Sequence, residues 1–111
     1  MPLYMYQFAY TAESWAAQIK NPQNRVETVG RAVCKSAGGK LISAWLCFGE
    51  YDAILIMDMP DAESMAAVAL AVGAGGALKT SKTTLLMTAA QGVDALSKAQ
   101  AVAKGYRPAG K

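Results

Sequence analysis

A tyrosine and an aspartate stand side by side at Tyr51-Asp52, directly after the pair Gly49-Glu50. A phenol next to a carboxylate can polarise or hold a small polar ligand. Arg25 offers an opposite charge, and Trp45 offers an aromatic wall for a pocket. We therefore take Tyr51, Asp52, Arg25 and Trp45 as the candidate ligand-binding residues. The alternative is that Tyr51 packs across its strand while Asp52 accepts backbone amides at the turn.

Several kinds of site are excluded by residue type or spacing. The chain has no histidine, so it cannot form a Ser-His or Cys-His nucleophile. The acidic group Asp58, Asp61 and Glu63 lies at an expected strand end and helix start, where capping accounts for at least one member. Residues 73–76 are glycine-rich but precede an expected strand, whereas a phosphate loop leads into a helix. We expect no catalytic residue, no metal, no cofactor and no nucleotide.

The composition is that of one globular domain: 111 residues, of which 53% are hydrophobic and 17% charged. The net charge of +3 comes from the C-terminal end, because residues 98–111 hold four basic groups and no acid. Residues 1–97 hold the other seven basic groups and all eight acids. With no basic stripe on the body, we expect no nucleic-acid partner and a solvated, partly frayed tail.

No apolar run is long enough to cross a membrane, and no secretory signal is visible at the start of the chain. We therefore expect a cytoplasmic protein with no membrane partner. In that compartment Cys34 and Cys47 stay reduced, and their apolar surroundings predict that both lie in or near the core.

Hydrophobic periodicity predicts the elements that must position these residues. Strands are expected at residues 3–11, 40–48, 51–59 and 77–89, with Gly49-Glu50 as a two-residue type II′ hairpin turn. Helical segments are expected at residues 11–19, from Pro22 to 37, 61–72 and 93–104. The order predicts an α+β fold, a ferredoxin-like βαββαβ sandwich with an additional C-terminal helix and the strand order 4-1-3-2.

Both side-chain parities of the first three strands are apolar, with Tyr4, Tyr6, Phe8 and Tyr10 sharing one side. The sheet face away from the helices would then expose apolar surface unless something covers it. A second copy of the sheet is the simplest cover and predicts a homodimer, with the aromatic residues contributing to the interface. The alternative cover is the C-terminal helix folding back, which is too short to mask four strands.

The hairpin sequence Phe48-Gly49-Glu50-Tyr51-Asp52-Ala53-Ile54-Leu55-Ile56 resembles the GYD domain family. Further landmarks agree with this resemblance: Asn21-Pro22 with Arg25, Gly38-Gly39-Lys40-Leu41, and Gly76 followed by Thr80, Thr83, Thr84 and Leu85. The resemblance spans residues 3–90 and implies a small, mostly bacterial protein of the dimeric α+β barrel type without an assigned activity. We divide the chain into a GYD-like domain at 1–97 and a basic helix end and tail at 98–111.

Two classes of function fit this reading. We expect a small dimeric binding or regulatory module, with a small-molecule ligand between the sheet and the helices, rather than an enzyme. The alternative, by fold analogy, is a cofactor-independent enzyme of the monooxygenase-like, dimeric α+β barrel type. A structural assembly subunit would be favoured if edge strands paired into higher oligomers.

Overall fold

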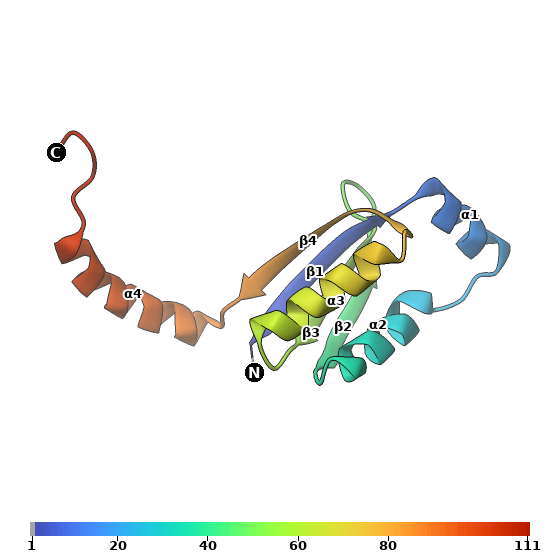
Figure 1. The fold of residues 1–111 in the computed structure, drawn as a ribbon. Helices are drawn as coiled ribbons and strands as arrows, with labels where there is room; N and C mark the ends of the chain where they lie inside the picture. Colours follow the sequence, from blue (N-terminus) through green and yellow to red (C-terminus); the bar gives the residue numbers. More distant parts are fainter. Residues whose placement is uncertain (1) are drawn as a thin grey trace.

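The computed structural model describes residues 2–111, so the domain boundary expected at residue 1 lies outside the described residues. One four-stranded antiparallel sheet carries its strands in the order β2-β3-β1-β4, which is the expected order read from the other edge (Figure 1). The elements are β1 (Leu3–Tyr10), α1 (Ala12–Lys20), α2 (Arg25–Ser36), β2 (Lys40–Leu46), β3 (Ala53–Asp58), α3 (Ala62–Ala74), β4 (Leu78–Leu86) and α4 (Ala89–Gly105).

The core is built on β1, which pairs with β3 on one side and with β4 on the other. Its aromatic residues Tyr4, Tyr6, Phe8 and Tyr10 are buried in the cluster that the helices cover. Neighbouring rings lie close, with centroids 5.5 Å apart for Tyr6 and Phe8 and 5.2 Å apart for Phe8 and Tyr10. The expectation that these aromatics contribute to a dimer interface is wrong, because the chain's own helices bury them.

The other side of the sheet carries the opposite parity of β1 and β3. Leu3 and Met5 of β1 and Ile54 and Ile56 of β3 are half-buried there. Met5 pairs with Ile56 across the two strands, so these side chains adjoin. The second face of β1 and β3 is therefore partly apolar, with Gln7 and Asp58 as polar members, and β2 adds Ser43 and Trp45 to it.

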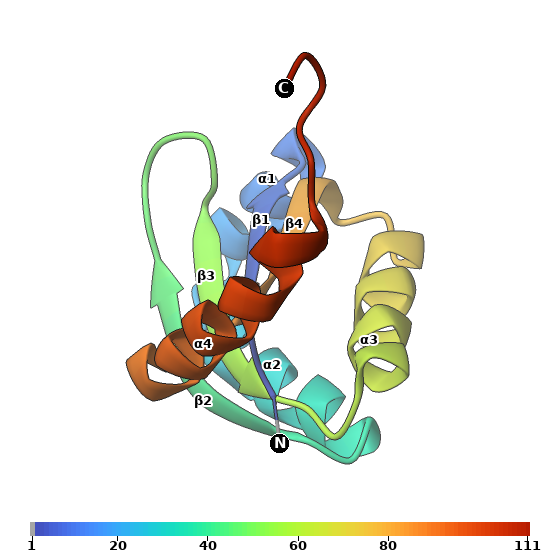
Figure 2. The same ribbon diagram turned by 90° about the vertical axis from the view of Figure 1, so that its left-hand side faces the viewer.

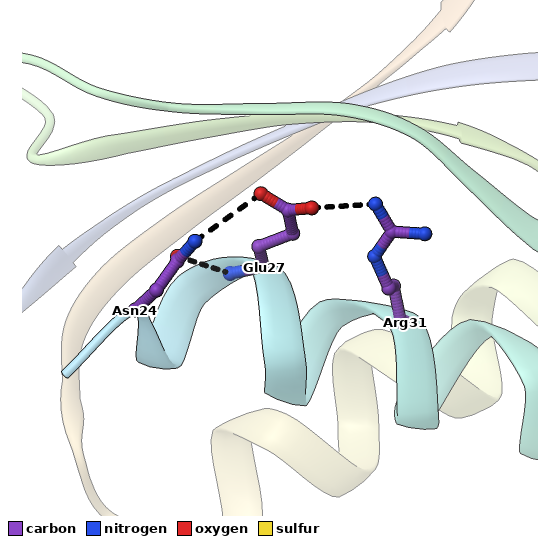
Figure 3. A network of polar contacts seen from close by, with 3 residues as sticks. All are labelled: Asn24, Glu27 and Arg31. Atoms are coloured by element: carbon purple, nitrogen blue, oxygen red, sulfur yellow. Dashed lines mark hydrogen bonds and ion pairs between the residues drawn. The ribbon is translucent and has the colours of Figure 1, made fainter.

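Helix α2 packs on β2 and β3. It begins at Arg25 rather than at Pro22, because Asn24 caps it by accepting a hydrogen bond from the Glu27 amide at 3.4 Å. Glu27 in turn pairs with Arg31 one turn later (Figure 3). Gly30 lets the helix approach the sheet, since a Cβ there would lie 2.9 Å from Leu55 Cδ2.

Helix α3 contacts β4 and starts at its expected cap, Asp61, which accepts a hydrogen bond from the Ser64 amide at 2.7 Å. Hydrogen bonds from Ser64 lower the pKa of the Asp61 carboxyl, as a capping carboxylate requires. The helix continues through Gly73 to Ala74, beyond the expected end. The chain reverses only at Gly76, whose φ is +79°.

The two cysteines are free, with Cys34 buried and Cys47 half-buried. Burial raises the pKa of the Cys34 thiol, so it stays protonated and packs as a small apolar side chain. The prediction of a core position is confirmed for Cys34, whereas Cys47 lies in the loop after β2 and is not part of the core cluster.

The hairpin between β2 and β3 is wider than expected. The strands end at Leu46 and resume at Ala53, so the two-residue turn at Gly49-Glu50 is wrong. The Cys47 amide donates to the Asp52 carbonyl at 2.8 Å and closes a longer loop, in which Gly49 has φ +137°. Hydrogen bonds to Asp52 at the base of the loop, described below, take the place of further strand pairing.

Helix α4 projects from the end of β4, away from the rest of the molecule (Figure 1). It starts at Ala89 rather than near Val93, because Thr88 and Gln91 form a reciprocal capping box. The radius of gyration is 17.7 Å, whereas a compact chain of this length has about 13 Å. None of the α4 residues is buried.

We expect Gly39→Ala to destabilise the fold and Gly73→Ala to leave it intact. A Cβ at Gly39 would lie 2.6 Å from Met59 Sδ and closer still to the Asp58 carbonyl oxygen, which is backbone and cannot swing aside. Such overpacking costs about 1–3 kcal/mol. At Gly73 in α3 a Cβ meets no atom within 4 Å, and alanine gains up to about 1 kcal/mol of helix propensity. Urea unfolding measures the free energy of unfolding of each variant. Equal values would contradict the close approach of Gly39 to Asp58 and Met59.

Candidate functional site

An apolar cleft lies between helices α2 and α3, over the centre of the sheet. Its cavity volume is about 80 Å³. It is lined from β1 and β3 by Tyr6, Phe8, Tyr10, Leu55 and Met57, from α2 by Arg25, Val26, Val29, Gly30 and Val33, and from α3 and the start of β4 by Val68, Val72, Ala77 and Leu78. A concave apolar surface with few polar groups is typical of a small-molecule site.

Two residues of this lining, Tyr6 and Arg25, carry a polar group without a partner among the described residues. The Tyr6 hydroxyl is buried, and among residues 2–111 it has no hydrogen-bond partner. Arg25, at the first position of α2, is exposed and forms no ion pair with the described residues. Among these residues, Arg31 and Glu27 form an ion pair within 4 Å. Buried hydroxyls normally find a partner, so an unpartnered one beside a cleft points to a missing acceptor or donor.

Tyr10 connects the cleft to the hairpin. Burial raises the pKa of its hydroxyl, the nearby Arg25 guanidinium acts in the opposite direction, and the Asp52 carboxylate adds to the rise. The phenol therefore stays protonated at neutral pH. Its ring also packs edge-on against Trp15 of α1, with centroids 5.0 Å apart.

Asp52 fastens the hairpin loop to β1. Its Oδ2 accepts a hydrogen bond from the Tyr10 amide at 2.9 Å, and its own amide donates to the Phe8 carbonyl at 2.8 Å. These bonds extend the pairing of β1 to the residue before the start of β3. Asp52 thus accepts a backbone amide, as the structural alternative supposed, although the amide belongs to β1 and not to the turn.

Tyr51 and Asp52 are not among the residues that line the cleft. Tyr51 lies half-buried in the hairpin loop, where its carbonyl accepts a hydrogen bond from the Cys47 thiol at 3.0 Å. Arg25 borders the cleft directly, and Asp52 reaches it only through Tyr10. The four candidate residues therefore do not form one constellation.

Trp45 lies on the outer strand β2, opposite Ile54, with 62% of its surface exposed. It shares a shallow groove with Arg25 and residues of the α1–α2 connection. Arg25 also borders a larger polar hollow between α1 and residues 75–77. Of the four candidate residues, Arg25 is therefore the one that lines the cleft, the groove and the polar hollow.

The cleft residues that the candidate set omitted are aliphatic. Val26, Val29, Gly30 and Val33 follow the helical spacing of α2, and Val68 and Val72 follow that of α3. Periodicity marks such residues as inward-facing but does not distinguish a packed core from a cleft. The cleft arises where two aliphatic helix faces meet over an aromatic strand without filling the space between them.

Among residues 2–111, no helix is long and apolar enough to span a membrane, and no group of three or more acidic or cysteine side chains is placed to hold a metal ion.

We expect Asp52→Ala to destabilise the fold by about 1–3 kcal/mol, because the Tyr10 amide loses its acceptor in a partly buried place. Asp52→Asn keeps a side-chain oxygen for that amide and should cost less than about 1 kcal/mol. Thermal or urea unfolding compares the two variants. Equal losses would mean that the charge, and not the hydrogen bond, holds the loop.

The comparison with known families agrees with the hairpin landmarks. A comparison with curated proteins finds no match. The model of the GYD domain matches residues 4–96, which include the sheet except for Leu3, the cleft and the first half of α4. The chain belongs to the GYD domain family.

Proposed function

We propose that this protein is a small, homodimeric ligand-binding module of the ferredoxin-like, dimeric α+β barrel type, with its ligand in the cleft between α2 and α3. The observation that carries the proposal is the unpartnered Tyr6 hydroxyl at an apolar cleft. Leaving a buried hydroxyl unpaired costs about 1–3 kcal/mol. A ligand that supplies the missing partner recovers that free energy on binding.

Arg25 and the cleft volume together suggest the class of ligand. The cavity of about 80 Å³ is near half of the roughly 150 Å³ that holds a benzene molecule. A short or branched aliphatic group therefore fits inside, and a larger body would have to widen the cleft. An unpaired guanidinium favours a carboxylate in bidentate contact. We propose a short-chain carboxylate whose apolar end enters the cleft and whose acid group meets Arg25.

The residues around the cleft favour binding over acid-base chemistry. Its lining is aliphatic and aromatic, and burial keeps the pKa of the Tyr10 hydroxyl above its ordinary value. A general base near neutral pH needs a pKa close to the working pH. Tyr10 is thus suited to donate a hydrogen bond to a bound oxygen, and it is poorly suited to take a proton from a substrate.

The homodimer is supported by the open face of the sheet. Met5 pairs with Ile56 there, Leu3 with Leu86 of β4 and Ile54 with Trp45 of β2, while α2 and α3 pack on the opposite face. Contiguous apolar surface of this kind marks an interaction site in a monomeric fold. A twofold pair covers the face of both copies at once.

We expect butyrate, 3-methylbutyrate or hexanoate to raise the melting temperature, and butyramide to have no effect because it lacks the charge that Arg25 would bind. Arg25→Gln should weaken carboxylate binding at least tenfold, since a charged hydrogen bond contributes about 1.5–3 kcal/mol. Arg31→Gln is the matched control, because Arg31 is on the same helix but pairs with Glu27. Calorimetric titration measures the affinities.

Tyr6→Phe tests the hydroxyl separately. Without ligand this variant should be at least as stable as the wild type, because it removes a buried unpaired group. Its melting temperature should respond less to the carboxylates. If no carboxylate binds the wild type, or if Arg25→Gln and Arg31→Gln bind equally well, the proposed ligand class is wrong.

We expect sedimentation equilibrium at micromolar concentration to give twice the chain mass of 11.7 kDa. The reason is the apolar open face, which a soluble monomer would expose to water. A single-chain mass throughout the micromolar range would contradict the homodimer while leaving the cleft proposal standing.

A further inference from the structure

We infer that the ligand of the cleft is an aliphatic α-amino acid, whose carboxylate meets Arg25 and whose ammonium group meets Glu13. The inference rests on the proposed function and deepens it, because it keeps the short-chain carboxylate in the cleft and adds one charged group to it. That group lies in the polar hollow between α1 and residues 75–77.

The polar hollow adjoins the cleft. Arg25 and Ala77 line both spaces, so a ligand in the cleft that extends past these residues enters the hollow. Figures 1 and 2 show α1 at the end of the sheet where β4 begins, away from α4. The Thr11 amide donates a hydrogen bond to the Ala77 carbonyl at 3.0 Å and fixes the start of α1 beside the start of β4. The two walls of the hollow are therefore held together by the backbone.

The two spaces differ in size and in lining. The cleft has a volume of about 80 Å³ and an apolar lining, whereas the open hollow has a volume of about 460 Å³ and is lined mainly by residues with polar side chains. A bare carboxylate beside Arg25 would leave most of the hollow to water. The arrangement therefore fits a ligand with a small apolar end and a larger polar end.

One face of α1 supplies most of the polar lining. The residues of α1 and its C-cap that line the hollow share this face: Glu13, Ser14, Ala17, Gln18 and Asn21. Ala17 lies in the middle of the face, and its small side chain keeps the hollow open. Trp15, on another side of the helix, packs against Tyr10. The helix thus uses one side for packing and keeps a separate polar face for the hollow.

The hollow carries one charge of each sign. Glu13 of α1 and Arg25 of α2 are both exposed, and among residues 2–111 neither has an ion-pair partner within 4 Å. They line the same hollow but are not paired with each other. An α-amino acid is a zwitterion whose ammonium and carboxylate groups are attached to one carbon atom, so a single ligand can meet both charges. Two opposite charges placed in this way complement such a ligand.

Gln18 offers a second acceptor for the ammonium group. Its Nε2 donates a hydrogen bond to the Ser14 hydroxyl at 3.1 Å, so its carbonyl oxygen Oε1 is the atom available to a ligand. An ammonium group has three N–H donors and no acceptor, and it needs several oxygen partners. Glu13 and Gln18 supply a carboxylate and an amide oxygen from the same helix face.

The cleft and Glu13 together define the class of amino acid. The short or branched aliphatic group that fits the cleft corresponds to the side chain of valine or of 2-aminohexanoate. Glu13 also acts against other ligands, because its negative charge repels a simple carboxylate at Arg25 and attracts an ammonium group. The hollow therefore favours a zwitterion over the parent acid.

Calorimetric titration of the wild type with matched ligands tests the ammonium group. Valine is 3-methylbutyrate with one added amino group, and 2-aminohexanoate has the same relation to hexanoate. We expect each amino acid to bind at least tenfold more tightly than its parent acid, because it adds a charge-assisted hydrogen bond. The positional control is 4-aminobutyrate, whose ammonium group would enter the apolar cleft, so it should bind more weakly than butyrate.

Glu13→Gln and Glu63→Gln in the full chain form a matched pair of variants. Each glutamate is exposed and lies in the first turn of its helix, but Glu63 belongs to α3 and does not line the hollow. We expect Glu13→Gln to reduce the preference for valine over 3-methylbutyrate at least fivefold without weakening 3-methylbutyrate. The reason is that the lost charge attracts the ammonium group and repels the carboxylate. Glu63→Gln should change both affinities less than about twofold.

The outcomes separate this inference from the proposed function. If 3-methylbutyrate binds through Arg25 but valine binds no more tightly, the carboxylate site stands and the amino-acid ligand is overturned. Equal effects of Glu13→Gln and Glu63→Gln on the preference for valine would overturn it as well. If neither ligand binds the wild type, or if Arg25→Gln weakens neither of them, the proposed function fails and the inference fails with it.

Discussion

The packing of the aromatic side of β1 against the helices is the constraint on which the other features depend. β1 is hydrogen-bonded on both edges, so its register fixes β3 and β4, and its alternation divides the sheet into two faces. Once Tyr4, Tyr6, Phe8 and Tyr10 turn towards α2 and α3, Leu3 and Met5 must face the other way. The cleft beside Tyr6 and the open face at Met5 are thus two results of one strand orientation.

That orientation also explains what the sequence could and could not predict. Alternation shows which residues of β1 share a face, and the strand order follows from the sequence of elements. Alternation does not show which face the helices cover when both are apolar, and for that reason it wrongly predicts the aromatic row at a dimer interface. Asn24 and Thr88 cap α2 and α4 through local hydrogen bonds. For this reason the helices start at Arg25 and Ala89 and not at the expected Pro22 and Val93.

The candidate site was predicted in part for the same reason. Arg25 could be found because a charged residue at a helix start is visible in the sequence, and it borders the cleft. The side-chain chemistry of Tyr51, Asp52 and Trp45 suits a ligand site, but a loop and an outer strand place them away from the lining. The aliphatic residues of α2 and α3 that line the cleft cannot be recognised from the sequence, because a valine beside a cleft and a valine in a core have the same spacing.

Of the hairpin residues, Asp52 acts on the cleft indirectly. Gly49 supplies a positive φ in the loop, and Asp52 holds the last residues of β1 through the Tyr10 amide and the Phe8 carbonyl. The Tyr10 side chain, which this bond keeps in place, lines the cleft and lies within the electrostatic reach of both Arg25 and Asp52. A loop that fastens a strand end thus also fixes one wall of the cleft, so the hairpin and the proposed ligand site are coupled through a single residue, Tyr10.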